Sequence, residues 1–164
     1  MVYFSYQEHI TNNKHYRAKK MTYNIKTQQL GATVNRLALG GLLVSHGIMK
    51  LKVFTIAGTV GYFASLGLPA EAAYLTIFGE VVGGTAILLG LLPRLAAALS
   101  VPLLLGAVWA HSGNGWVFSN AGGGWEFPAY LAVSALAVAL QGGGRFALGN
   151  LPIVQKLLPK FLRK

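Results

Sequence analysis

The sequence contains no cysteine and no aspartate, and only four of its 164 residues are acidic. Without cysteine the chain has no disulfides, no thiol redox chemistry and no thiolate metal ligands. Charged residues make up 11% of the chain, against about 25% in soluble domains. Hydrophobic residues make up 54%, which leaves too little polar surface to coat a soluble globule. The composition therefore predicts an integral membrane protein.

The sequence also lacks the motifs of several common chemistries. It has no P-loop and no nucleophile elbow, and the glycines at 122–124 follow no predicted strand, so they are not a phosphate loop. No flavin, haem or iron–sulfur signature is present. No two histidines share metal-ligand spacing, and the histidines and glutamates of the apolar region are scattered over separate segments. We therefore predict no metal site and no cofactor held by the chain alone.

Four apolar segments predict membrane-spanning helices, at about residues 33–51, 72–92, 95–111 and 125–140. Between the first two, residues 53–68 are moderately apolar and uncharged, and they end at a proline. We expect this segment to form a short interfacial or re-entrant helix; if it spanned the membrane, every later element would be inverted. The predicted fold class is all-α, a polytopic membrane protein with a four-transmembrane-helix bundle.

The flanking regions differ from the apolar middle of the chain. Residues 1–31 are polar and basic and predict a disordered cytoplasmic arm, and Met21 leaves open whether residues 1–20 belong to the natural product. Residues 32–148 form the predicted membrane domain. Residues 149–164 alternate apolar and basic positions, which fits either an amphipathic segment on an anionic leaflet or a solvated basic tail.

The net charge of +10 is concentrated at the two ends of the chain. With four spans, twelve of the 14 lysines and arginines fall on one side, including the anchoring residues Arg36, Arg94 and Arg145, and only Lys50 and Lys52 fall on the other. The positive-inside rule then places both termini in the cytoplasm. Basic ends next to apolar spans favour lipid headgroups over nucleic acid as the charge partner. Trp125 is expected at the outer interface.

The segment 72–92 is the most informative, because it holds a single charge, Glu80, close to the expected midplane. A carboxylate at that depth is costly, so it marks either a functional site or a packing helix whose acid pairs with a neighbour. We rank its expected partners as His46, then Lys50, then Arg36. Gly79 and Gly83 lie on one helical face, which serves either internal packing or association with another chain.

A candidate site follows from the expected depths of the polar residues. At 1.5 Å per residue, five ionisable side chains fall in the outer half of the bundle: His46, Lys50, Glu80, His111 and Glu126. His111 and Glu126 lie near the interface, where polar residues need no special role.

Four segments in order resemble the DoxX family of small bacterial four-helix membrane proteins: RLALGGLLVSHGIMKL, GEVVGGTAILLGLLPR, HSGNGWVFSNAGGGWEFP and GGGRFAL. They cover about residues 36–148. The family takes its name from a membrane subunit associated with thiosulfate:quinone oxidoreductase, and similar proteins are linked to membrane-associated oxidoreductase assemblies. The resemblance therefore implies a multi-pass protein of the bacterial inner membrane, and it implies fold more strongly than reaction.

Three functions are compatible with these observations. The first is an accessory subunit of a membrane-associated oxidoreductase assembly that contacts a quinone, with electrons supplied by a partner subunit. The second is a non-catalytic scaffold or assembly protein, active through partners or as a homo-oligomer. The third is a transporter of a small solute or protons, motivated by ionisable residues at mid-depth.

Overall fold

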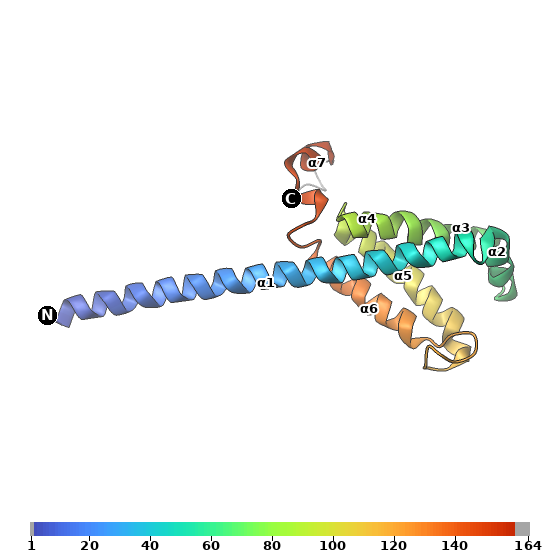
Figure 1. The fold of residues 1–164 in the computed structure, drawn as a ribbon, viewed down its shortest axis with the longest axis horizontal. Coiled ribbons are helices and arrows are strands. Elements are labelled where there is room, and N and C mark those ends of the chain that lie inside the picture. The colour runs from blue at the N-terminus through green and yellow to red at the C-terminus, as the bar shows by residue number, and fades with distance from the viewer. Residues whose placement is uncertain (1, 160–164) are drawn as a thin grey trace.

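The computed structural model describes residues 2–159, and every regular element in that range is a helix (Figure 1). The first helix, α1 (Val2–Lys52), is long, and its N-terminal part projects away from the bundle (Figure 1). The prediction of a disordered arm is therefore corrected, since residues 2–31 continue the first span as helix. No proline or glycine interrupts residues 2–30, and extending an existing helix costs less than starting one.

Helix α2 (Thr55–Ser65) follows α1 after a sharp bend of 100°. Thr55 takes a left-handed φ of 62° at this corner. A short helix was expected here, and the structure contains it at the end of the molecule farthest from the N-terminus (Figure 1). Its interfacial or re-entrant placement stays a prediction.

The segment that carries Glu80 is built from three consecutive helical pieces. They are α3 (Ala70–Phe78), the π-helical turn η1 (Gly79–Gly83) and α4 (Gly84–Leu89). The segment ends at Leu89, slightly before the predicted boundary, because Gly90 adopts a left-handed φ of 73°. The π-helical turn was not predicted; it places an extra residue in the turn that contains Glu80.

The remaining chain forms two antiparallel helices and a short tail. Helix α5 (Pro93–His111) continues into the 3₁₀ turn η2 (Ser112–Asn114), and a loop leads to α6 (Glu126–Gln141). A second 3₁₀ turn, η3 (Leu148–Asn150), precedes α7 (Pro152–Leu157).

Two of these segments are long and apolar enough to cross a membrane, Ala70–Leu89 and Pro93–Asn114. A third is counted if α1 and α2 form one broken span. Helix α6 is apolar but has 16 residues, fewer than the roughly 20 of a usual span. The structure thus confirms an all-helical protein with candidate spans, and the predicted four-span arrangement stays a prediction.

The core lies where α1 packs against α4, α5 and α6. Leu39 and Leu43 of α1 are 1% exposed, and they join buried residues of the other three helices: Ile87, Ala97, Leu104, Leu131, Ala132, Ala135 and Val138. This packing fixes the depth of α1 beside the α3–η1–α4 segment and therefore brings Lys50 of α1 close to Glu80 of η1.

Glycines allow α1 and α4 to approach closely, but they are not the pair singled out in the sequence. A Cβ on Gly40 would lie 2.5 Å from the nitrogen of Leu88, and one on Gly84 would lie 2.8 Å from Cβ of Leu43. A Cβ on Gly79 would meet Leu103, and one on Gly83 would approach only Ser100, at 4.0 Å. The face formed by Gly79 and Gly83 therefore packs internally against α5, which is one of the two predicted uses.

Candidate functional site

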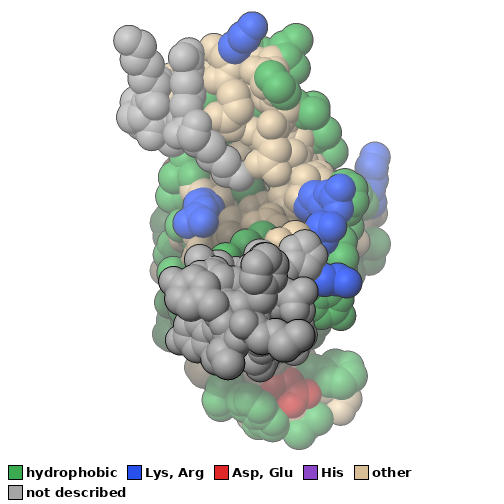
Figure 2. All heavy atoms as spheres, turned by 90° about the vertical axis from the view of Figure 1, so that its left-hand side faces the viewer, with side chains coloured by type: hydrophobic (Ala, Val, Ile, Leu, Met, Phe, Trp, Pro, Cys, Tyr) green, Lys and Arg blue, Asp and Glu red, His purple; other side chains and the backbone are tan. Residues whose placement is uncertain are grey.

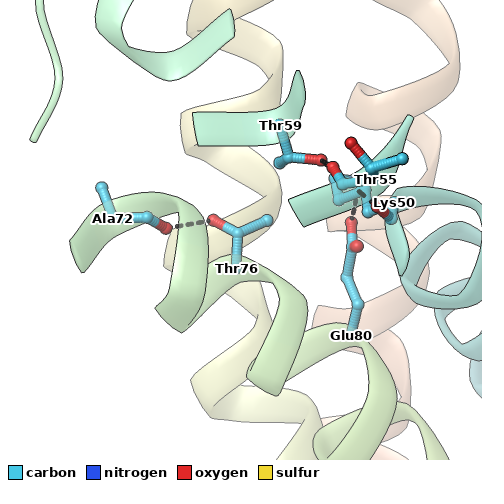
Figure 3. Close-up of polar contacts among 6 residues, drawn as sticks. All are labelled: Lys50, Thr55, Thr59, Ala72, Thr76 and Glu80. Carbon is cyan, nitrogen blue, oxygen red and sulfur yellow. Dashed lines mark hydrogen bonds and ion pairs between the residues drawn. The ribbon is translucent and has the colours of Figure 1, made fainter. Parts of the chain in front are cut away.

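The central feature of the site is an ion pair between Lys50 and Glu80. Lys50 Nζ lies 2.8 Å from Glu80 Oε1, joining the last turn of α1 to the π-helical turn (Figure 3). The two side chains are 18% and 8% exposed. The prediction of His46 as the first partner of Glu80 is wrong: the imidazole lies one turn earlier on α1 and packs against the ring of Phe127, with centroids 5.7 Å apart.

Gly47 explains how α1 can come so near to η1. A Cβ at this position would lie 2.6 Å from Cγ2 of Val81 and 3.1 Å from Cβ of Glu80. The missing side chain leaves room for the π-helical turn between His46 and Lys50. Single π-turns inside α-helices are frequent at functional sites, because the widened turn redirects one side chain.

Helix α2 is attached to the same corner through Thr59. Its hydroxyl donates to the carbonyl of Thr55 at 2.9 Å and to that of Lys50 at 3.4 Å (Figure 3). Thr76, one turn before Glu80, instead donates to the carbonyl of Ala72 within its own helix. The polar link between α2 and the ion pair therefore runs through the backbone of Lys50.

Two cavities share lining residues at this site. The smaller, of about 220 Å³, lies inside the bundle and is lined by His46, Lys50, Glu80 and His111 together with apolar side chains. The larger, of about 510 Å³, lies under α2 and shares His46, Lys50 and His111 with the smaller one. Four of the five predicted site residues therefore meet around one space, and ligand sites commonly combine apolar walls with a few polar groups in this way.

Glu80 has a second oxygen that is not used. Its Oε2 atom is buried and has no hydrogen-bond partner, the one such side-chain atom found in the described part of the chain. A buried acceptor left unpaired costs about 1–3 kcal/mol. Such atoms are rare in native proteins, and each one calls for an explanation such as a role in catalysis or binding.

His111 is held by the glycine-rich loop between α5 and α6. Its Nδ1 lies 3.1 Å from the carbonyl oxygens of both Gly122 and Gly123. Because carbonyls only accept, Nδ1 carries a proton, and in the neutral ring Nε2 is then an acceptor. Asn114 donates to the same two carbonyls at 2.9 Å, so the loop fixes the imidazole at the edge of both cavities.

Glu126 does not join the other four residues. Its Oε1 accepts a hydrogen bond of 2.9 Å from the backbone N–H of Phe118, so it closes the loop instead. The neighbouring Trp125, predicted at the outer interface, makes an edge-to-face contact with Trp116, with centroids 4.4 Å apart. The prediction that Glu126 belongs to the polar cluster is therefore corrected, because the cluster residues line a cavity that Glu126 does not reach.

The predicted anchoring arginines lie at the opposite end of the bundle. Arg36 is 2% exposed, and its guanidinium donates to the carbonyls of Gly143 at 2.8 Å, Ile87 at 3.0 Å, Phe146 at 3.3 Å and also Leu88. It satisfies carbonyls at the C-terminus of α4, which have no partner within the helix. Arg36 is therefore a packing clamp and not a partner of Glu80. The other two are exposed: Arg94 approaches the carbonyl of Gln141 and Arg145 lies over the ring of Phe146.

Sequence reasoning missed the aromatic part of the site. Phe54, Tyr62 and Phe63 line the larger cavity, and they come from α2 and the corner before it. The two adjacent aromatic residues in an otherwise small-residue helix were the available signal. Within the described residues, no group of three or more histidines and acids is placed to hold a metal ion.

Comparisons with known proteins agree on one family. The family model DoxX matches residues 31–113, about half of the chain. "Putative oxidoreductase CatD" of Bacillus subtilis is 29% identical over 123 residues, which cover 75% of this chain and 87% of that protein. "Inner membrane protein YqjF" of Escherichia coli is 30% identical over 128 residues, covering 77% and 95%. "Uncharacterized membrane protein Rv3486" of Mycobacterium tuberculosis is 42% identical over 77 residues, covering 46% and 45%. No solved structure matches the chain.

Proposed function

The chain belongs to the DoxX family of membrane proteins, and we propose that it is an accessory subunit of an oxidoreductase assembly of the bacterial inner membrane that binds a quinone ring. The observation that carries the proposal is the meeting of His46, Lys50, Glu80 and His111 at two cavities with apolar and aromatic walls. The Bacillus subtilis relative, which is named a putative oxidoreductase, supports the same direction.

The larger cavity suits a substituted ring. Its volume of about 510 Å³ lies within the roughly 300–1,000 Å³ of small-molecule sites. Phe54, Tyr62 and Phe63 offer aromatic surfaces against which a ring can stack. Lys50 and His46, which line both cavities, can donate hydrogen bonds to the ring oxygens and so orient the ligand.

A partner supplies the redox centre in this proposal. The chain has no cysteine and no flavin, haem or iron–sulfur signature, so electrons would pass between the bound quinone and another subunit. The quinone site is what the chain itself contributes.

We further propose four membrane passes, formed by α1, the α3–η1–α4 segment, α5 and α6, with both termini in the cytoplasm. Exposed cations support this orientation, since the face seen along α1 from its N-terminal end carries several lysines and arginines (Figure 2). Exposed examples are Lys19, Lys20, Lys26, Arg94, Arg145 and Lys156. Helix α6 is about 24 Å long at 16 residues, a mismatch that local thinning of the bilayer accommodates.

Fewer observations support the alternative functions. A scaffold role was motivated by the face of Gly79 and Gly83, and that face packs against α5 within the chain. Transport of a solute or protons stays a prediction without a specific observation in its favour.

Photolabelling tests the quinone site. Purified protein in lipid nanodiscs is irradiated with an azidoquinone, with and without excess decylubiquinone, and labelled peptides are mapped by mass spectrometry. We expect competed label on residues 46–63, and the double variant Tyr62→Ala, Phe63→Ala to weaken competition about tenfold or more. The matched control is Tyr130→Ala, which removes an aromatic ring that is 66% exposed on α6. Label that resists competition, or that spreads over the outer helix faces, would reject the site.

A further inference from the structure

We infer that the segment after α6 forms a surface that binds anionic phospholipids, at the end of the bundle that holds Arg36. Residues 145–157, which include η3 and α7, make up this tail surface. The sequence left open whether the tail lies on an anionic leaflet or in water. This end lies opposite the quinone site, so the lipid binding does not depend on the proposed function.

Contacts of its backbone hold the tail surface against the end of α4. Arg36 donates to the carbonyl of Phe146 at 3.3 Å, and the N–H of Gly149 donates to the carbonyl of Gly90 at 3.0 Å. Ala147 packs closely here as well, since a Cβ on Gly90 would lie 2.6 Å from Cβ of Ala147. The segment is therefore a fixed part of the bundle beside the end of α4 (Figure 1).

This attachment places the tail surface at the level of a membrane surface. Gly90 lies in the turn between the two candidate spans, Ala70–Leu89 and Pro93–Asn114. A turn between two spans lies where the chain leaves the hydrocarbon core. The hydrogen bond from Gly149 to Gly90 therefore fixes the tail beside the headgroups of the bilayer.

The burial pattern of the tail surface is the reverse of that expected in water. Its buried residues are small, namely Ala147 and Gly149. Its large apolar side chains are 40–80% exposed: Phe146, Leu148, Leu151, Ile153 and Leu157. Scattered exposed apolar residues are normal, but so many in one short segment mark a surface that another apolar phase covers.

Helix α7 shows the same reversal within its six residues. The side chain of Gln155 donates to the carbonyl of Gly149 and so faces the bundle. Ile153 and Leu157 are four residues apart, which places them on one helical face, and both are exposed. A helix that packs on a protein in water would turn these two side chains inward and the glutamine outward.

The charge at this end indicates that the lipids are anionic. Arg145 and Lys156 are exposed in the tail surface, and Arg94 is exposed at the start of α5. The acids of residues 17–159 lie in α3, in η1 and in the first turn of α6, toward the other end of the bundle. Seen from this end, lysine and arginine side chains stand among apolar ones (Figure 2). Apolar side chains at the headgroup boundary together with cations are the pattern that binds an anionic leaflet.

Single cysteines test this inference, because the natural chain has none. Ile153→Cys and Leu157→Cys are labelled with the environment-sensitive fluorophore NBD in the purified full-length protein. The protein is placed in nanodiscs of phosphatidylcholine, alone or mixed with anionic phosphatidylglycerol, and a spin-labelled lipid serves as quencher. The reference is Met21→Cys, which is 64% exposed on the projecting part of α1. We expect blue-shifted emission and lipid quenching at 153 and 157 but not at 21, with quenching about twofold stronger in the anionic nanodiscs.

Charge variants of the labelled protein assign the lipid selectivity to the tail surface. Arg145→Gln combined with Lys156→Gln should abolish the dependence on phosphatidylglycerol, because each cation near an anionic surface favours binding. The matched control Lys19→Gln combined with Lys20→Gln removes the same charge from the projecting part of α1, and it should keep the dependence.

Three results would overturn the inference, and none of them bears on the quinone site. Emission at 153 and 157 that matches emission at 21 would mean that water solvates the tail. Blue-shifted emission without lipid quenching would mean that a second copy or another protein covers it. Equal quenching in both kinds of nanodisc would mean that the tail touches lipid without selecting anionic headgroups.

Discussion

Gly47 on α1 lies directly against Val81 in the π-helical turn, so that a Cβ on the glycine would be 2.6 Å from Cγ2 of the valine. This contact sets the distance between the two segments that carry Lys50 and Glu80. The ion pair and the smaller cavity both lie beside it, because Lys50 follows Gly47 by one turn and Glu80 precedes Val81 by one residue.

Replacing Gly47 should therefore damage both stability and the site. We expect Gly47→Ala to lower the free energy of unfolding by about 1–3 kcal/mol, the usual cost of overpacking, and to separate Lys50 from Glu80. Thermal unfolding in detergent measures the effect. Gly41→Ala is the matched control on the same helix, since, apart from its chain neighbours and the nearby backbone of its own helix, no atom lies within 4 Å of its added Cβ. Equal destabilisation by the two variants would contradict the role given to Gly47.

Removing one partner of the ion pair should lower the free energy of unfolding more than removing both partners. Lys50→Met leaves the Glu80 carboxylate buried without a counter-charge, so we expect a loss of up to about 3 kcal/mol in the free energy of unfolding. Adding Glu80→Gln to Lys50→Met should restore part of that loss. A double-mutant cycle checks this, with the exposed Lys52→Met as the control that changes charge alone. Strictly additive effects would mean that the two side chains do not interact.

Arg36 should resist even the conservative replacement by lysine. Its planar guanidinium reaches carbonyls of α4 and of the segment after α6, and an ammonium group cannot bond to them all. We expect Arg36→Lys to lower the free energy of unfolding by at least about 3 kcal/mol, since each bond to a charged donor contributes about 1.5–3 kcal/mol. Arg94→Lys, at an exposed arginine with one bond of 3.5 Å, should be close to neutral. Similar unfolding temperatures for the two variants would refute the clamp.

The adjacent glycines Gly83 and Gly84 should behave differently. A Cβ on Gly84 would lie 2.8 Å from Cβ of Leu43 and 3.0 Å from the nitrogen of Val44, whereas one on Gly83 would meet only Ser100 Oγ at 4.0 Å. We expect Gly84→Ala to destabilise the protein by about 1–3 kcal/mol and Gly83→Ala to be tolerated. Unfolding curves of the two variants decide this. A greater destabilisation by Gly83→Ala than by Gly84→Ala would instead place Gly83 at the helix interface.

Membrane topology can be read from single cysteines, because the natural chain has none. Met21→Cys lies on an exposed position of α1, and Ser119→Cys lies on the exposed loop between α5 and α6. With four passes and cytoplasmic termini, a membrane-impermeant maleimide added to intact cells should label position 119 and not position 21. Labelling of both positions from the same side would exclude the proposed arrangement.

Much of the candidate site could be predicted from spacing and expected depth. Placing helices of known rise at a common depth predicts that His46, Lys50 and Glu80 lie close together. This prediction needs only the position of each residue along its own helix. The choice of Lys50 over His46 as partner depends on the π-helical turn and on the ring of Phe127 beside His46. Neither is visible in the pattern of apolar residues. Glu126 was misassigned because the path of the glycine-rich loop, which brings Phe118 to its carboxylate, follows from tertiary contacts.

The sequence by itself determined that this is a helical membrane protein with one acid deep in an apolar segment, because composition and hydropathy depend on each residue separately. The sequence also indicated the family, because four segments that resemble its motifs occur in the expected order. Only the tertiary structure decided which glycines lie at the contact between α1 and α4, that Arg36 binds backbone carbonyls and not Glu80, and that the aromatic residues of α2 line the same cavity as Lys50. The physical reason is that close packing depends on the distance between atoms of different helices, which helix geometry and residue type leave open.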